Sequence, residues 1–177
     1  NAINIKNDPY FCDNLGRVYT KTGEYKNAIE ILKRGLEQDS KNYSLWFDLA
    51  VAYRENHNWS EAKKAYLEVL KLNPKLHQAY FNLAYLCFND SEPFKAVECY
   101  EKALETMPED FETKYFLSLA YMQTMDYEKG LKYFESRLCR LSALISQQKT
   151  YPNLAKDENI WKGEDISDKT MLVNFEQ

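Results

Sequence analysis

The sequence predicts an all-α fold, a solenoid of helical hairpins followed by a short non-repeat C-terminal tail. A period of 34 residues and, inside each period, apolar residues three and four positions apart predict these hairpins. The composition agrees, because only 5 Gly and 5 Pro accompany 14 Tyr and 9 Phe in the 177 residues. Sandwiches and barrels of β-strands would need more turn residues.

Shifting the chain by 34 residues brings six columns of similar residues into register. Two columns hold small residues, which let paired helices approach closely, and the others hold mainly large residues that fill the space between helices. The columns are Leu15, Leu49, Leu83 and Leu117; Gly16, Ala50, Ala84 and Ser118; Tyr19, Tyr53, Cys87 and Tyr121; Ala28, Ala62, Ala96 and Gly130; Leu32, Tyr66, Tyr100 and Phe134; and Leu36, Leu70, Leu104 and Leu138.

Each period contains two apolar blocks separated by a short polar break, which predicts one helical hairpin per period. Pro74 and Pro108 close second helices, and Gly23 supplies a permissive turn. In the last unit an apolar stripe predicts one helix from about residue 127 to residue 148, which covers the end of the stack. We expect six large residues to be mostly buried: Trp46, Leu49, Tyr66, Tyr80, Leu83 and Tyr100.

The predicted units are residues 9–42, 43–76, 77–110 and 111–149. Residues 1–8 are expected to end a preceding repeat helix, because Ala2, Ile3 and Ile5 precede Asn7-Asp8. Residues 150–177 are expected to form a linker and the start of a truncated downstream domain.

The repeat residues resemble the tetratricopeptide repeat (TPR) family over residues 9–144. The resemblance rests on Leu15-Gly16 with Tyr19 in the first unit, and in the second unit on Trp46, Leu49, Tyr53, Ala62, Tyr66 and Pro74. The fourth unit departs from the pattern, with Lys114 in place of the aromatic residue and Ser142 in place of the proline. The resemblance implies a right-handed superhelix whose concave wall, formed by the first helix of each hairpin, holds a protein or an extended peptide.

Helical spacing from the packed leucines nominates the residues of that wall. The candidates for peptide binding are Asn14, Arg17, Phe47, Asp48, Arg54, Phe81, Asn82, Tyr85, Tyr115 and Phe116. This wall is expected to be polar at its start and aromatic later.

Two features of the candidate wall each allow two interpretations. The column Asn14, Asp48 and Asn82 resembles the asparagine ladder of the O-linked N-acetylglucosamine transferase repeats, which would bind a peptide backbone, or it consists of ordinary solvated polar residues. The later aromatic residues could receive apolar side chains or pack between repeats. A clamp for acidic chaperone tails is disfavoured, because the column in which such repeats carry Lys holds Asp13, Phe47, Phe81 and Tyr115.

Charge and cysteine usage exclude several classes of partner. The 23 Lys and Arg against 27 Asp and Glu give a formal charge of -4 without a basic run, so neither nucleic acid nor membrane is an expected partner. The four cysteines and two histidines lack metal-ligand spacing, so no metal, cofactor or catalytic role is predicted. Isolated cysteines fit a reducing compartment, which predicts a cytoplasmic location.

The tail resembles the junction between repeats and a glycosyltransferase-like domain in bacterial TPR proteins. It carries Trp161-Lys162-Gly163, a predicted strand from Thr170 to Phe175, and then Glu176-Gln177. Two functions therefore remain open: a non-catalytic adaptor, or the substrate- or partner-holding arm of a larger sugar-transferring enzyme. We also expect self-association through the tail or the exposed repeat ends, because an isolated strand needs a partner.

Overall fold

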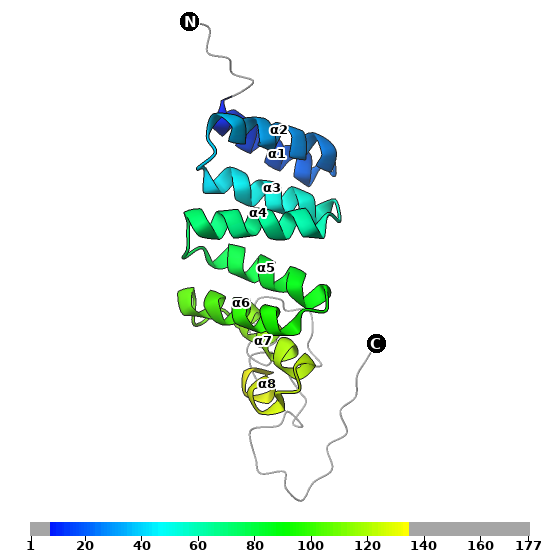
Figure 1. Cartoon of the computed structure of the whole chain (residues 1–177), viewed down its shortest axis with the longest axis vertical. Coiled ribbons are helices and arrows are strands. Elements are labelled where there is room, and N and C mark those ends of the chain that lie inside the picture. Colours follow the sequence, from blue (N-terminus) through cyan, green and yellow to red (C-terminus); the bar gives the residue numbers. More distant parts are fainter. Residues whose placement is uncertain (1–7, 135–177) are drawn as a thin grey trace, which may run out of the picture. The chain divides into compact units, whose positions relative to one another are not determined.

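The computed structural model describes residues 8–134 of the chain, and this part is built from eight α-helices with no strand. Successive helices form antiparallel pairs that stack in chain order (Figure 1). The helices are α1 (Pro9–Lys21), α2 (Tyr25–Gln38), α3 (Tyr43–Glu55), α4 (Trp59–Leu72), α5 (His77–Asn89), α6 (Pro93–Thr106), α7 (Phe111–Gln123) and α8 (Tyr127–Phe134). The predicted all-α fold of helical hairpins is confirmed.

Polar side chains start several of the first helices. The Asp8 carboxylate accepts hydrogen bonds from the backbone N–H groups of Tyr10 and Phe11, at 2.9 and 3.1 Å. Asn42 caps α3 in the same way, and Asp110 caps α7 by accepting from the N–H of Thr113 at 2.8 Å. Such caps satisfy the N–H groups that have no partner inside the helix.

The turn inside each hairpin contains one residue in the left-handed backbone region. These residues are Gly23, His57, Ser91 and Met125, with φ of 81°, 58°, 56° and 63°. They recur at the 34-residue period of the sequence. Only the first hairpin uses glycine there, so the other three turns hold a side chain where glycine is favoured.

The predicted columns form one hydrophobic core. Leu49, Leu83 and Leu117 are buried, as are Tyr66 and Tyr100 in the second helices. The small column allows close helix approach: a Cβ built on Gly16 would lie 2.5 Å from side-chain atoms of Leu32. Any larger residue at this position would therefore force α1 and α2 apart.

The prediction that Trp46 and Tyr80 are mostly buried is wrong. Both side chains are only partly buried, whereas Leu45 and Ala79, one position earlier, are fully buried. Trp46 and Tyr80 lie on the floor of grooves between successive second helices, and the indole N–H of Trp46 donates to the Ser40 carbonyl at 2.9 Å. A repeat position that is large in sequence can thus border a groove.

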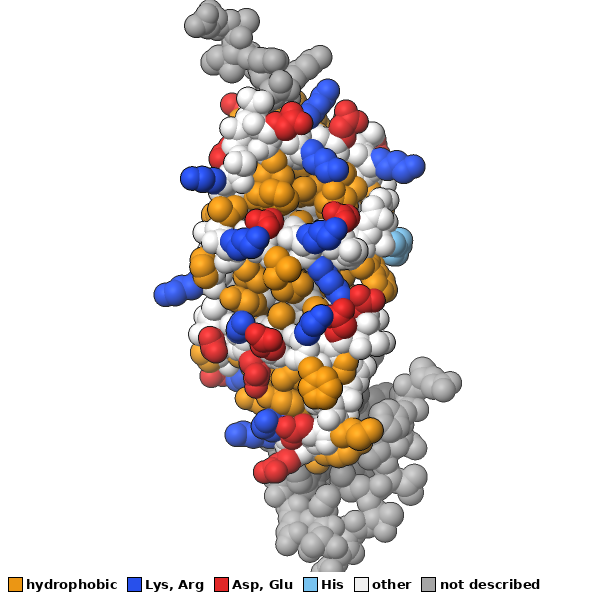
Figure 2. All heavy atoms as spheres, in the orientation of Figure 1, with side chains coloured by type: hydrophobic (Ala, Val, Ile, Leu, Met, Phe, Trp, Pro, Cys, Tyr) orange, Lys and Arg blue, Asp and Glu red, His pale blue; other side chains and the backbone are white. Residues whose placement is uncertain are grey.

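We call these two grooves the outer grooves. Figure 2 shows apolar bands alternating with rows of charged side chains down this face of the stack. The first groove has a volume of about 630 Å³ and the second about 680 Å³. One wall of the first groove comes from α2, through Lys33, Leu36 and Glu37, and its floor comes from α3. Leu67, Leu70 and Lys71 of α4 form the corresponding wall of the second.

Several sequence predictions fall outside the described residues. These are the preceding helix end at residues 1–7, the continuation of the last helix beyond Phe134, and the linker and downstream segment at 150–177. The unit boundaries remain predictions.

Candidate functional site

The ten predicted wall residues all lie on the first helices of the four hairpins. We call the face that carries them the wall. Contacts link it from one hairpin to the next: Arg17 Nε lies 3.9 Å from Asp48 Oδ2, and Arg54 Nη1 donates to Asn82 Oδ1 at 2.5 Å. The rings of Phe81 and Phe116 continue it, with centroids 5.7 Å apart. The wall is therefore continuous from α1 to α7.

One cavity on the wall brings together side chains from three consecutive hairpins. We call it the wall pocket, and its volume is about 420 Å³. It includes five of the ten predicted residues, Arg54, Phe81, Asn82, Tyr85 and Phe116. Four further residues complete the lining, namely Glu55, His57, Trp59 and Glu112.

Sequence reasoning missed His57 and Trp59, because they come from the turn of the second hairpin and the start of α4. The signal that could have found His57 is its place 34 residues after Gly23, in a turn that projects beside the wall.

Hydrogen bonds fix the polar side of the wall pocket. The Arg54 guanidinium donates to Glu55 Oε1 through Nε at 3.1 Å and through Nη2 at 2.6 Å, besides its bond to Asn82. Asn82 Nδ2 donates to the Gln78 carbonyl at 2.8 Å. An amide group has two donor hydrogens and two acceptor lone pairs, so Asn82 keeps one of each for a ligand. The charge of Arg54 is already balanced by Glu55.

Aromatic rings form the other side of the wall pocket. The Phe116 ring packs edge-on against Phe81 and Tyr85 and stacks on Tyr100, with centroids 5.7, 5.9 and 6.1 Å away. Phe81 and Phe116 are partly buried, while Tyr85 is 38% exposed. The aromatic residues thus divide between the two interpretations: Phe81 and Phe116 mainly pack, and Tyr85 presents its ring to the cavity.

The remaining candidates lie elsewhere on the wall. Phe47 packs edge-on against Tyr66 at 5.7 Å, and Tyr115 contacts Phe116 at 5.5 Å. Asn14 is exposed, and its Nδ2 donates to the Tyr10 carbonyl at 3.0 Å, the same pattern that Asn82 shows. Arg17 and Asp48 belong to a separate polar cluster.

That cluster contains a buried pair of carboxyls, Asp13 on α1 and Asp48 on α3. We call it the acidic pair. Ser44 Oγ donates to Asp13 Oδ2 at 3.0 Å, but Asp13 Oδ1 and Asp48 Oδ2 are buried without a donor. Burial, a hydrogen bond to Asp13 and its like charge raise the pKa of Asp48 from 3.8 to about 7, although Arg17 opposes the shift. A single proton held between the two carboxyls supplies the missing donor.

Metal-ligating groups do not gather within residues 8–134. No cluster of three or more His, Cys, Asp and Glu residues suited to a metal ion occurs there, and Cys12, Cys87 and Cys99 are free thiols. In the same part of the chain, no helix combines the length and apolarity needed to cross a membrane.

Two sequence profiles described as Tetratricopeptide repeat match the chain, at residues 19–85 and 77–110. Together they span more than half of the 177 residues. The chain belongs to the tetratricopeptide repeat family.

Relatives of this TPR chain occur in animals and bacteria. It is 28% identical over 133 residues to BBSome complex member BBS4 of Bos taurus, a match that covers 73% of this chain and 25% of that protein. It is 26% identical over 134 residues to Protein O-mannosyl-transferase TMTC3 of Homo sapiens, covering 67% and 15%. TPR repeat-containing protein YpiA of Bacillus subtilis is 24% identical over 122 residues, covering 69% and 29%. The chain therefore spans only about a quarter of the length of such relatives.

Solved structures share the TPR fold. The crystal structure of MamA superimposes with a TM-score of 0.73 at 25% identity, covering 79% of this chain and 82% of that one. The first TPR of Spaghetti (RPAP3), bound to the HSP90 peptide SRMEEVD, gives a TM-score of 0.65 at 24% identity, covering 68% and 95%.

Proposed function

We propose that this chain is a non-catalytic scaffold that binds an extended segment of another protein along its wall, with the wall pocket as the main anchoring point. The observation that carries the proposal is the convergence of three hairpins on one cavity that offers an amide, an exposed aromatic ring and apolar side walls. The similarly folded first TPR of Spaghetti, which is bound to a peptide, supports the same use of this fold.

The wall pocket favours a particular kind of peptide. Asn82 pairs with the peptide backbone through its remaining donor and acceptor, which makes this contact independent of the peptide sequence. Tyr85 and Phe116 receive an apolar side chain. Glu55 balances Arg54, and Glu112 adds a negative charge at the rim, so apolar segments with neutral or basic flanks are preferred over acidic ones.

The same proposal includes the location and chemistry of the scaffold. Free thiols at Cys12, Cys87 and Cys99 suit the reducing cytoplasm, and the scaffold works there without a cofactor.

Peptide selection tests the proposal. Peptides are selected from a random display library on the whole chain, and the affinities of purified binders are measured by calorimetry. Asn82→Ala is expected to weaken binding by about 1 to 3 kcal/mol, because it removes hydrogen bonds to the peptide backbone. Tyr85→Ala is expected to weaken it by about 1 to 2 kcal/mol through lost ring contact.

Leu67→Ala is the matched control, since Leu67 is exposed on the second outer groove and far from the wall pocket in the list of its contacts. It should leave peptide affinity unchanged. Binders whose affinity falls with Leu67→Ala but not with Asn82→Ala or Tyr85→Ala would place the binding surface on the outer grooves and refute the proposal.

A second candidate function is favoured by the tail and by one relative. Residues 159–177 resemble the junction to a glycosyltransferase-like domain, and TMTC3, named as a protein O-mannosyl-transferase, matches over the repeats. In this alternative the wall holds the substrate or partner of a larger sugar-transferring enzyme. Sequencing the parent gene beyond Gln177 tests it: a glycine-rich turn followed by alternating strands and helices supports the enzyme, and a stop codon supports the adaptor.

A further inference from the structure

The first hairpin has an apolar face that the other three hairpins bury. On α1 this face consists of Phe11, Leu15, Val18 and Tyr19, and we call it the leading face. Phe11 is 38% exposed and Val18 54% exposed. The residues one, two and three periods further on are all at most 9% exposed: Leu45, Leu49, Ala52 and Tyr53; Ala79, Leu83, Leu86 and Cys87; Thr113, Leu117, Ala120 and Tyr121.

In each later hairpin the preceding hairpin covers this face. Helix α3 packs against both α1 and α2, α5 packs against α4, and α7 packs against α6 and α5. The fit is close at the first of these interfaces, where a Cβ built on Gly35 of α2 would lie 3.1 Å from the Leu45 side chain. The same surface is therefore an inter-hairpin interface three times within this molecule.

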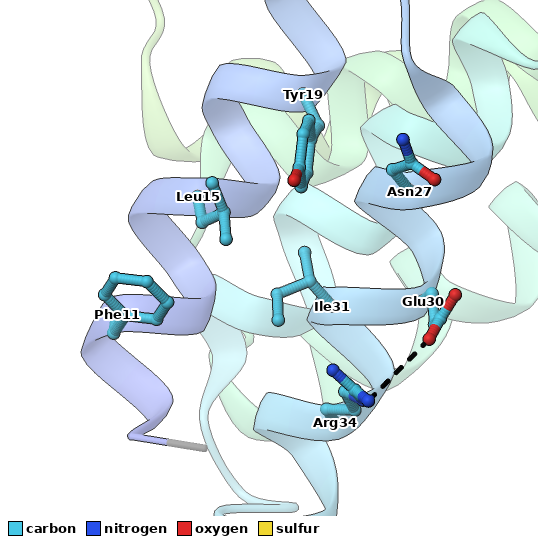
Figure 3. Close-up of a pocket in the computed structure, with 7 residues that line it drawn as sticks. All are labelled: Phe11, Leu15, Tyr19, Asn27, Glu30, Ile31 and Arg34. Carbon is cyan, nitrogen blue, oxygen red and sulfur yellow. Dashed lines mark ion pairs between the residues drawn. The ribbon is translucent and has the colours of Figure 1, made fainter. Parts of the chain in front are cut away.

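A cavity beside the leading face has the composition of half an outer groove. Figure 3 shows Phe11, Leu15 and Tyr19 on α1 facing Ile31 of α2 across this cavity, whose volume is about 270 Å³. Leu15, Tyr19 and Ile31 are equivalent to Leu49, Tyr53 and Ala65 of the first outer groove. That groove has a second wall, contributed by the preceding second helix. Among residues 8–134 nothing contributes such a wall here.

The polar rim of the cavity also follows the repeat. Arg34 and Glu30 form an ion pair at 3.9 Å (Figure 3), and Lys102 and Glu98 form one at the equivalent rim of the second outer groove, at 2.8 Å. A solenoid that ended at this face would be expected to carry a polar outer surface instead. Both the apolar centre and the charged rim thus match an internal interface.

We propose that the leading face docks one further TPR hairpin, carried by the same polypeptide, whose second helix supplies the missing wall of the cavity. The occupant packs on α1 as α1 and α2 pack on α3. Its second helix places an apolar residue opposite Leu15 and Tyr19, in the manner of Leu36 in the first outer groove. This interface is independent of the peptide-binding function proposed for the wall.

A fusion tests the proposal directly. A copy of residues 9–41 is joined ahead of Asp8 in the chain, in place of residues 1–7, which keeps the 34-residue spacing. The copy brings its own Gly35, which leaves room for Phe11 as it does for Leu45. Amide hydrogen exchange of α1 is then compared with that of the unextended chain. We expect exchange of the α1 amides to slow at least tenfold.

The matched control is the same fusion with Val18→Glu in the original first hairpin. Because Val18 is exposed in the unextended chain, Val18→Glu should leave that chain folded, whereas in the fusion it should abolish the added protection of α1. Equal α1 exchange in the fusion and in the unextended chain overturns the proposal, whether or not the added hairpin folds. So does sedimentation of the unextended chain as a dimer that Val18→Glu dissociates, because the occupant would then be a second copy.

Discussion

The two halves of the wall put opposite chemistry at the same three repeat positions. Asp13, Arg17 and Asp48 line the first two hairpins, and the residues two periods later are Phe81, Tyr85 and Phe116. The first set forms a buried charged cluster, and the second forms a network of ring contacts that borders the wall pocket. The buried columns behind both sets are alike. The fold thus depends on the columns and leaves the chemistry of the wall free to vary.

The largest expected contrast is between Phe116 and its equivalent, Asp48. Phe116→Ala removes contacts with four rings, those of Phe81, Tyr85, Tyr100 and Tyr115, and should lower the free energy of unfolding by about 3 to 4 kcal/mol. Asp48→Ala should cost less than about 1 kcal/mol at neutral pH, because it also removes a buried like charge. Guanidinium unfolding followed by circular dichroism measures both. Similar losses for the two variants would remove the distinction between the halves.

The acidic pair should make the first half sensitive to pH. The pKa of Asp48 is raised in the folded state from 3.8 to about 7, so between these values the folded protein holds a proton that the unfolded chain releases. The free energy of unfolding should therefore fall as pH rises through this range and level off above about pH 7.

Asp48→Asn tests this effect, and it restores the residue type found at Asn14 and Asn82. It should stabilise the protein by about 1 to 3 kcal/mol above pH 7 and by much less near pH 4. Thermal unfolding across the pH range provides the measurement. Asp13→Asn should give the same pattern, since either change removes the like charge. A stabilisation by Asp48→Asn that is equal at both pH values would contradict the shared proton.

The smallest expected effect concerns the turns, which differ between the first hairpin and the last. Met125 has a φ of 63° and is largely exposed, so Met125→Gly should relieve backbone strain and stabilise the fold by about 0.5 to 1 kcal/mol. Met125→Ala removes the side chain without relieving the strain and should have no such benefit. Gly23→Ala should lose about 1 kcal/mol, because Gly23 already occupies this backbone region. Denaturant unfolding that ranks Met125→Ala above Met125→Gly would argue against strain in the turn.

The hairpins and their core were predictable because burial recurs with the period. Leu49, Leu83 and Leu117 occupy one column and are all buried. The same reasoning was wrong for Trp46 and Tyr80, because side-chain size alone does not separate a core position from the floor of a groove. The left-handed turn residues follow Gly23 at the same spacing, so the sequence held a signal for them that residue type concealed.

The candidate site was only partly predictable. Helical spacing placed Arg54, Asn82 and Tyr85 on one face, and the structure groups them around one cavity. The acidic pair was not predicted, because Asp13 and Asp48 lie on different helices and sequence spacing does not give the separation of their side chains. Nor does it indicate that Glu55 already balances the charge of Arg54.

The helix contacts of this chain join elements close in sequence, and the most extensive are within hairpins or between adjacent ones. A chain built in this way closes only short loops as it folds, which favours rapid folding with low contact order. It also makes the 34-residue unit a natural quantum of evolutionary change. Duplication or deletion of one unit lengthens or shortens the wall while the register of every other hairpin is preserved.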